Sequence, residues 1–282
     1  MKGLVLEGGA MRGMYTAGVL DVLLKNGISF DTTVGVSAGA VFGCSFHSKQ
    51  YGRAIRYNKK YCRDKRYMSL KSLILTGNLF GEQFCYHDIP ERLDPFDTKT
   101  FEENPGKFYV VTTDVKTGKP IYHLCKDGGE EDIEWMRASA SLPLVSKIVK
   151  TEGYEMLDGG ISDSIPVEWM ISKGANKIVL VLTREKGYRK EKNPAMPVIK
   201  FLYRKYPQFI EACESRYIVY NKTLELVDKL EKEGKVFVIR PEKNLGISKL
   251  EKNPENLQIV YDKGKSDMEK QMDNLKKYFK IY

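Results

Sequence analysis

A serine between two glycines is the strongest chemical signal in the sequence. The pentapeptide Gly35-Val36-Ser37-Ala38-Gly39 follows a short apolar run and precedes small residues that are compatible with a helix. The GxSxG pattern is typical of a nucleophile elbow, a sharp strand-to-helix turn that exposes a serine hydroxyl above a sheet. A serine that only caps a helix would show the same five letters. The strand before Ser37 and the helix after it favour the nucleophile.

A second glycine-rich run, GGAMRG from Gly8 to Gly13, also lies between a predicted strand and a predicted helix. Acyl transfer passes through a tetrahedral oxyanion, and backbone N–H groups of such a loop can bind it. Met14 follows Gly13 where a Walker A loop requires lysine, so a phosphate-binding loop of that type is excluded. The glycines at 8 and 9 are adjacent, which does not match the dinucleotide fingerprint GxGxxG. A plain tight turn is the remaining alternative.

A serine nucleophile also needs a base that accepts its proton. Histidine is the usual base, but no histidine follows position 123, whereas the α/β-hydrolases place theirs after the serine and the acid. His47 follows Ser37 on the same predicted helix, and His87 lies in a predicted loop. His123 lies within a predicted strand, where a pair with Asp114 stays open. A carboxylate is therefore the favoured base.

Asp158 is a candidate for this base, because it precedes Gly159 and Gly160, although an aspartate before two glycines is by itself usually a turn. Taken in order, the runs GGAMRG, GVSAG and DGG resemble the glycine-rich loop, serine and aspartate motifs of the patatin-like phospholipase family. The segment ASASLP at 138–143 resembles a further block of that family. The resemblance covers about residues 4–183.

The resemblance implies a catalytic dyad without histidine. The resemblance implies that Ser37 attacks the ester carbonyl and that Asp158 accepts the serine proton. It also implies that the N–H groups of Gly8, Gly9 and Ala10 bind the oxyanion. Ala10 is a departure, because many members carry a third glycine there. The resemblance also assigns supporting roles to Arg12, Gly13, Gly35, Gly39, Gly159 and Gly160. No metal and no cofactor is expected, since the histidines and acids show no ligand spacing.

These motifs need strands and helices to position them. Apolar runs predict strands at 2–6, 33–36, 108–115, 120–125, 178–183 and 236–240. Helical spacing predicts a helix that stops at Gly27 and others near 130–140, 167–173, 198–233 with one or more breaks, and 256–279. This alternation implies an α/β fold with three αβα layers and a largely parallel central sheet.

We expect residues 1–282 to form a single patatin-like hydrolase domain. Its motif-bearing core is expected at about 1–185, and a helical and mixed C-terminal extension at about 186–282. The polar segment 186–197 is expected to form a long surface loop or a lid.

The positive charge of the chain is concentrated in one segment. The net charge is +9, from 46 basic and 37 acidic residues, and the stretch Lys49–Lys71 holds nine bases and one acid. Such a stretch can contact an anionic membrane, although a solvated helix face would have the same composition. No nucleic-acid partner is expected, because no recognised motif accompanies the charge. Five cysteines without a CxxC pair, no leader and no apolar run of ~20 residues predict a cytoplasmic protein, at most peripherally membrane-bound.

Together these features predict a serine acyl-ester hydrolase that deacylates lipid esters, such as phospholipids or lysophospholipids, through an acyl-enzyme. A soluble esterase or thioesterase for short acyl chains is the alternative within the same class. A lipid-binding protein with a vestigial dyad is the alternative from another class.

Overall fold

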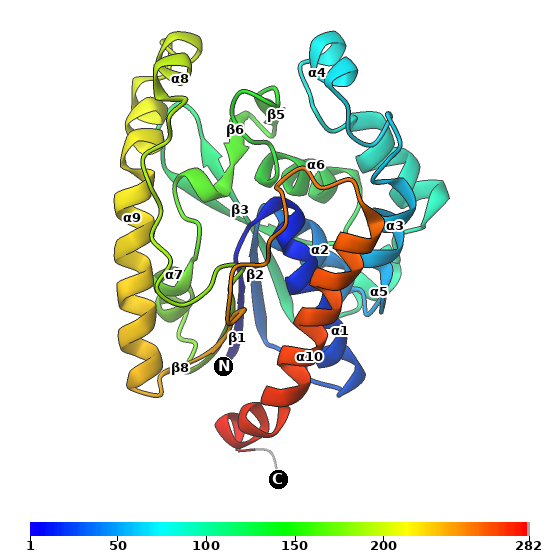
Figure 1. The fold of residues 1–282 in the computed structure, drawn as a ribbon, viewed down its shortest axis with the longest axis vertical. Helices are drawn as coiled ribbons and strands as arrows, with labels where there is room; N and C mark the ends of the chain where they lie inside the picture. Colours follow the sequence, from blue (N-terminus) through cyan, green and yellow to red (C-terminus); the bar gives the residue numbers. More distant parts are fainter. Residues whose placement is uncertain (281–282) are drawn as a thin grey trace.

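The centre of the molecule is a mixed sheet whose strands are short apolar runs. The computed structural model describes residues 1–280, so the last two residues of the predicted 1–282 domain lie outside the described part. Eight strands form the sheet in the order β5-β6-β3-β2-β1-β7-β8, and β4 pairs with β3 off this path (Figure 1). Its parallel part consists of β3 (Lys107–Asp114), β2 (Thr32–Val36), β1 (Lys2–Leu6), β7 (Lys177–Val181) and β8 (Val236–Ile239).

One end of the sheet is antiparallel. Both β4 (Pro120–Cys125) and β6 (Tyr154–Asp158) pair antiparallel with β3, and β5 (Val149–Thr151) pairs antiparallel with β6. The largely parallel sheet is confirmed, but the predicted strands omit β5 and β6. Both are short, and polar residues interrupt them, so neither shows an apolar run long enough to predict a strand. The omission matters because β6 ends at Asp158.

Helices cover both faces of the sheet, which confirms the three-layer arrangement. They are α1 (Gly13–Lys25), α2 (Ala38–His47), α3 (Arg53–Tyr61), α4 (Leu70–Thr76), α5 (Thr98–Glu102), α6 (Glu130–Ser139), α7 (Val167–Ser172), α8 (Met196–Leu202), α9 (Pro207–Lys232) and α10 (Pro254–Phe279), with short helical segments η1 (Ala10–Arg12), η2 (Phe84–Leu93) and η3 (Gly159–Ile161). On one face α1, α2 and α10 bury Leu4 and Leu6 of β1. On the other, α7 and α9 pack over Val5, because strand side chains alternate between the faces.

The C-terminal helix α10 packs directly on α1. A Cβ atom added at Gly264 of α10 would lie 2.1 Å from the carbonyl oxygen of Tyr15, so the two backbones are in contact there. Two buried hydrogen bonds join the same helices, from the Tyr15 hydroxyl to Asp267 at 3.0 Å and from the Tyr261 hydroxyl to Asp21 at 2.7 Å. Because α1 begins at the end of the glycine-rich run, α10 stabilises the helix that follows this run.

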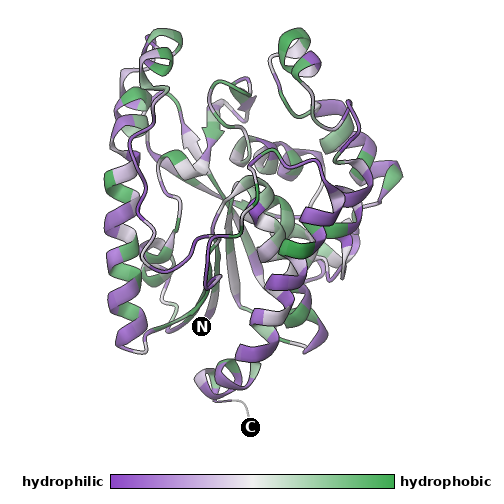
Figure 2. Ribbon diagram, viewed as in Figure 1, coloured by the Kyte–Doolittle hydropathy of each residue, from purple (hydrophilic) through white to green (hydrophobic). Residues whose placement is uncertain are grey.

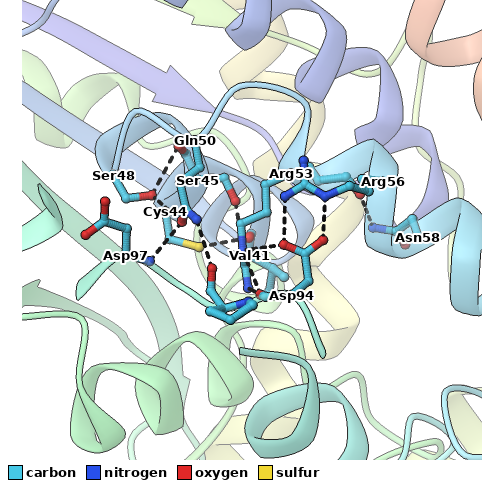
Figure 3. A network of polar contacts seen from close by, with 12 residues as sticks. Val41, Cys44, Ser45, Ser48, Gln50, Arg53, Arg56, Asn58, Asp94 and Asp97 are labelled. Atoms are coloured by element: carbon cyan, nitrogen blue, oxygen red, sulfur yellow. Dashed lines mark hydrogen bonds and ion pairs between the residues drawn. The ribbon is translucent and has the colours of Figure 1, made fainter. Parts of the chain in front are cut away.

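The basic stretch Lys49–Lys71 is not one solvent-facing patch. Arg53 is only 4% exposed, and its guanidinium donates hydrogen bonds to the Asp94 carbonyl oxygen and to Ser45 (Figure 3). Arg56 binds the Asp94 carboxylate through two hydrogen bonds of 2.7 Å, and Arg66 pairs with Asp64. Part of the charge therefore stabilises the fold, whereas other bases of the stretch stay exposed.

Hydrophobic residues gather in the central strands, but they also reach two projecting tips of the molecule, at α4 and α8 (Figure 2). Both tips project from the end of the molecule opposite the N-terminus (Figure 1). Among the helices of residues 1–280, none is long and apolar enough to cross a membrane.

The α1–α10 contact can be tested with Gly264→Ala. In an exposed helix this change normally stabilises by up to about 1 kcal/mol, but here the methyl group would collide with the α1 backbone. We expect a loss of about 1–3 kcal/mol in the free energy of unfolding, measured by urea denaturation. Asp273→Ala on the exposed side of α10 is the control, and a stabilised Gly264→Ala protein would contradict the contact.

Candidate active site

Ser37 lies at a strained turn between β2 and α2. Its backbone has φ 55° and ψ −121°, a combination with positive φ that is uncommon for any residue other than glycine. The Ser37 N–H donates a 2.8 Å hydrogen bond to the hydroxyl oxygen of Ser139, which itself donates at 2.6 Å to the carbonyl oxygen of Val111 on β3. Ser139 thus anchors the turn to the sheet, a role that the sequence did not identify.

The glycines of GxSxG are required by close backbone contacts. A Cβ atom at Gly35 would lie 2.6 Å from the carbonyl oxygen of Gly39, and one at Gly39 would lie 2.4 Å from that of Leu6. At Gly8 it would lie 2.7 Å from Cβ of Ser37. Real side chains do not tolerate such distances, so the elbow fits against β1 and the glycine-rich loop only with glycine at these positions.

The glycine-rich loop follows β1 and faces the same turn. The N–H groups of Gly8, Gly9 and Ala10 have no hydrogen-bond acceptor among residues 1–280, and the loop is closed by a 3.1 Å hydrogen bond from Arg12 N–H to the Gly9 carbonyl. Ala10 has φ 49°, the left-handed conformation that a glycine would adopt without strain. Three adjacent donors are therefore available to a negatively charged ligand.

A buried carboxylate holds this loop in place. Glu7, only 3% exposed, accepts hydrogen bonds from the backbone N–H of Thr183 at 2.6 Å, from the Thr183 hydroxyl at 3.1 Å and from the Tyr220 hydroxyl at 2.5 Å. Thr183 lies just after β7, and Tyr220 lies on α9. No motif marked these three residues, because they are widely separated in the sequence and are of types that commonly serve other roles.

Asp158 ends β6 and faces the cavity at Ser37. Its Oδ1 atom accepts the Gly160 N–H at 2.8 Å, whereas its Oδ2 atom is buried with no hydrogen-bond partner. Gly159 must be glycine, since a Cβ atom there would lie 2.1 Å from the Val111 carbonyl oxygen. A buried carboxylate oxygen without a donor is costly, and it is free to accept a proton.

The surroundings of Asp158 adjust its acidity in two directions. Burial raises the pKa of the carboxyl above its ordinary value, because the charged form loses its water. The guanidinium of Arg216, the Ser37 hydroxyl, the Gly160 N–H and the Lys190 ammonium oppose this rise. The net pKa is raised, so Asp158 is a stronger base than an aspartate in water.

Two cavities meet at Ser37. The polar one is lined by the loop residues Gly8, Gly9 and Ala10 and by Asp158, with several basic side chains around it. The other is mostly apolar and includes Met11, Val41, Phe42, Tyr57, Tyr67, Phe80 and Tyr86. Ala10, Ser37 and Leu142 border both cavities. A serine at this boundary can meet a ligand that has one apolar and one polar part.

The three sequence motifs converge on the polar cavity. Gly8, Gly9, Ala10, Arg12, Ser37, Asp158 and Gly160 line it, while Gly13, Gly35, Gly39 and Gly159 lie behind the lining, at the close contacts between segments. Gly13 faces Phe42 of α2, 2.7 Å from the position of an added Cβ atom.

The histidine alternative is wrong. His123 Nε2 lies 3.1 Å from Oδ1 of Asp132, and the Asp114 carboxylate instead accepts the Thr117 hydroxyl at 2.8 Å. His47 is buried away from the cavity, where desolvation lowers its pKa to about 4. In the described part of the chain no histidine lines either cavity at Ser37.

One side-chain group among residues 1–280 has the spacing of metal ligands. It consists of His123, Cys125 and Asp132, with ligand atoms within 4.8 Å of one another. Asp132 Oδ2 already accepts three backbone N–H groups, from Lys126, Asp127 and Gly128, and Oδ1 contacts His123. The carboxylate is thus satisfied by the protein and has a structural role.

Comparisons with known proteins give the family of the chain. Residues 4–171 match the model of the family described as "Patatin-like phospholipase", and residues 206–280 match that of a "Domain of unknown function (DUF6363)". The chain is 32% identical over 184 residues to "Uncharacterized protein YjjU" of Escherichia coli (strain K12). The aligned part covers 64% of this chain and 51% of that protein. It is 28% identical over 184 residues to "Lysophospholipase nte1" of Aspergillus oryzae. This alignment covers 64% of this chain and 11% of that protein.

The chain therefore spans about half the length of the bacterial relative and about a tenth of the fungal one. Among solved structures, VipD from Legionella pneumophila aligns with a TM-score of 0.46 at 12% identity, over 97% of this chain and 67% of that chain.

The opposing effects on Asp158 predict a pH shift in an Arg216→Gln protein. Removing this guanidinium takes away the largest influence that lowers the pKa of Asp158, so that pKa should rise further. If the Asp158 carboxylate is the base for Ser37, it becomes protonated at a higher pH in the variant. The reaction of Ser37 should then slow at a higher pH in Arg216→Gln than in the wild-type protein as the solution is acidified. The rate of Ser37 labelling by a fluorophosphonate, followed against pH, measures this. Lys186→Gln, which removes an exposed charge paired with Glu231, is the control. If the labelling rate falls at the same pH in all three proteins, Asp158 is excluded as the base.

Proposed function

The chain belongs to the patatin-like phospholipase family, and from this membership and the site geometry we propose that it is a serine hydrolase that deacylates lipid esters. The observation that carries the proposal is the buried Oδ2 atom of Asp158, which has no hydrogen-bond partner and lines the same cavity as Ser37. A general base needs such an uncommitted oxygen within reach of the proton that it accepts. A purely structural aspartate would have its oxygens satisfied.

The proposed reaction has two halves. Ser37 Oγ attacks the ester carbonyl while its proton passes to Asp158, and the N–H groups of Gly8, Gly9 and Ala10 stabilise the oxyanion. The tetrahedral intermediate collapses, and the alcohol leaves with the proton from Asp158. A water molecule then gives a proton to Asp158 and attacks the acyl-enzyme, which releases the fatty acid and returns the proton to Ser37.

The apolar cavity favours lipid esters over the alternative of short acyl esters or thioesters. Its aromatic and aliphatic side chains, among them Phe42, Tyr67 and Phe80, offer the surface that an acyl chain of some length would bury. We further propose that the motif-bearing core and the C-terminal extension act as one hydrolase unit. This is supported by β8, which extends the sheet beside β7, and by α10, which packs on α1.

We also propose that the enzyme meets its substrate at an anionic membrane, through the exposed part of Lys49–Lys71 and the adjoining helix α4. In that region Arg63, Lys65 and Lys71 are exposed and have no ion-pair partner in the described structure. On α4 itself, Ile74 is 82% exposed and Leu70 is 72% exposed. Bases beside exposed apolar side chains suit an anionic lipid surface.

The dyad is tested by reaction of the intact protein with a fluorophosphonate, read by mass. We expect one adduct on the wild-type protein and none on Ser37→Ala. In Asp158→Asn the base is lost, so labelling should slow by about 10²–10⁴-fold. Asp114→Asn should label at the wild-type rate, because Asp114 lies outside both cavities. Binding of lipid without any adduct on the folded wild-type protein would instead support a non-catalytic lipid-binding protein.

The membrane contact is tested with a Lys65→Glu/Lys71→Glu protein. Each lost base weakens attraction to an anionic surface by about 1 kcal/mol, so binding to vesicles with phosphatidylglycerol at low salt should fall at least about tenfold. The control reverses two exposed lysines outside this region, Lys25 and Lys173. Sedimentation of the proteins with vesicles measures the binding, and equal loss in both proteins would show that net charge alone is responsible.

A further inference from the structure

The polar cavity beside Ser37 is strongly basic. Five basic side chains line it, and the only acids among its lining residues are Glu7 and Asp158. One base, Arg12, belongs to the glycine-rich run. The others follow β7 in the chain and were not singled out by the sequence: Arg184, Lys190, Arg216 and Lys249.

None of these five side chains has an acidic partner. Within residues 1–280 they form no ion pair and donate no side-chain hydrogen bond, and the Nε atoms of Arg12 and Arg216 are buried without an acceptor. Neither acid of the lining forms an ion pair with them, and the Asp158 Oδ2 atom stays without a hydrogen-bond partner. Glu7 is occupied by Thr183 and Tyr220. All but the exposed Lys249 are half-buried, and half-buried charges without partners are costly, so this arrangement is stabilised when an anion enters.

Two of the cations, Arg184 and Lys190, are positioned by contacts within the protein. Arg184 lies over the ring of Tyr188, 4.2 Å from its centre, and Lys190 lies over the ring of Tyr220 at 4.4 Å. The loop that carries Lys190 is fastened to α9 by two hydrogen bonds, because Asn221 accepts the Lys190 N–H at 2.8 Å and donates to its carbonyl oxygen at 3.0 Å. A binding site formed in advance loses little entropy when it is filled.

The bases also disfavour one another's charge. Burial and then the nearby Arg216 lower the pKa of Lys190 to about 7, and burial and Arg12 lower that of Lys249. A bound anion opposes this repulsion and holds Lys190 in its charged form.

We infer that this cavity binds a phosphate monoester on the alcohol part of the acyl ester, an inference that rests on the hydrolase activity proposed above. Ser37 lies where the basic cavity meets the apolar one, so an ester carbonyl at Ser37 would have its acyl chain on one side and its phosphate on the other. A phosphocholine headgroup fits less well. Its ammonium would need an aromatic face, and those of Tyr188 and Tyr220 are covered by Arg184 and Lys190.

The test compares three esters with the same lauroyl chain: lauroylglycerol phosphate, lauroylglycerophosphocholine and monolauroylglycerol, all as monomers in solution. We expect the wild-type protein to show its highest kcat/KM on the phosphate monoester. The quantity compared is kcat/KM for the phosphate monoester divided by kcat/KM for monolauroylglycerol. This ratio should fall about tenfold or more in Lys190→Gln and in Arg216→Gln, because a charge-assisted hydrogen bond contributes about 1.5–3 kcal/mol. The ratio matters because a change in the pKa of Asp158 alters all three rates alike.

Lys186→Gln removes the same charge in the same loop outside the cavity lining, and it should keep the wild-type ratio. Turnover of all three esters at similar rates, with ratios unchanged in the variants, would overturn the phosphate inference and leave the hydrolase standing. If inorganic phosphate inhibits all three esters while their ratios stay equal, the cavity is a site for free phosphate and the headgroup assignment is wrong.

Calorimetry separates the two proposals. Ser37→Ala protein should bind lauroylglycerol phosphate, and Ser37→Ala/Lys190→Gln protein should bind it about tenfold more weakly. Such binding, with no phosphonate adduct on the wild-type protein and no turnover of any ester, would reject the hydrolase and retain the anion site. Absence of binding by Ser37→Ala protein would reject the anion site.

Discussion

The close approach of three backbone segments at the ends of β1, β2 and β6 determines the rest of the site. A Cβ atom at Gly39 would lie 2.4 Å from a β1 carbonyl oxygen, and one at Gly159 would lie 2.1 Å from a β3 carbonyl oxygen. These contacts leave no space for side chains, so the elbow, the glycine-rich loop and the aspartate turn can meet around one point. The positive φ of Ser37 is strained, and it persists because Ser139 and these neighbours hold the turn from several sides.

The three motifs and the parallel strands could be located from the sequence, because they depend on local patterns. GxSxG and DGG occupy a few adjacent residues, and the parallel strands are continuous apolar runs. The strand that ends at Asp158 was missed, since β6 has only five residues, and they form neither a continuous apolar run nor a regular alternation. The Glu7–Tyr220 contact joins residues 213 positions apart, and no local pattern encodes such a pair. The same holds for Arg216 and Lys190, which surround Asp158 only after α9 has packed on the sheet.

Two kinds of unsatisfied group lie in one cavity, and they are of opposite sign. Asp158 keeps an oxygen without a donor, while Arg12 and Arg216 keep buried nitrogens without acceptors. An ion pair between them would stabilise the protein and lower the pKa of Asp158 toward that of a weak base. The geometry avoids that pair: Arg216 acts on Asp158 through the electric field without forming a salt bridge, so the pKa of the carboxyl stays raised.

The C-terminal third is therefore part of the site as much as of the scaffold. Helix α9 provides Tyr220, which holds Glu7 beneath the glycine-rich loop, and Arg216, which adjusts Asp158. The segment before α10 touches the same loop, since the Met11 N–H donates to the Lys249 carbonyl oxygen at 3.5 Å. The region that matches the family of unknown function, residues 206–280, thus contacts the patatin-like region at Glu7 and Met11, on either side of Gly8, Gly9 and Ala10. Arg216 and Lys249 of this region lie on segments separate from those of Ser37 and Asp158, although all four residues line one cavity. The charge of the cavity can therefore change through this region without any change in Ser37 or Asp158.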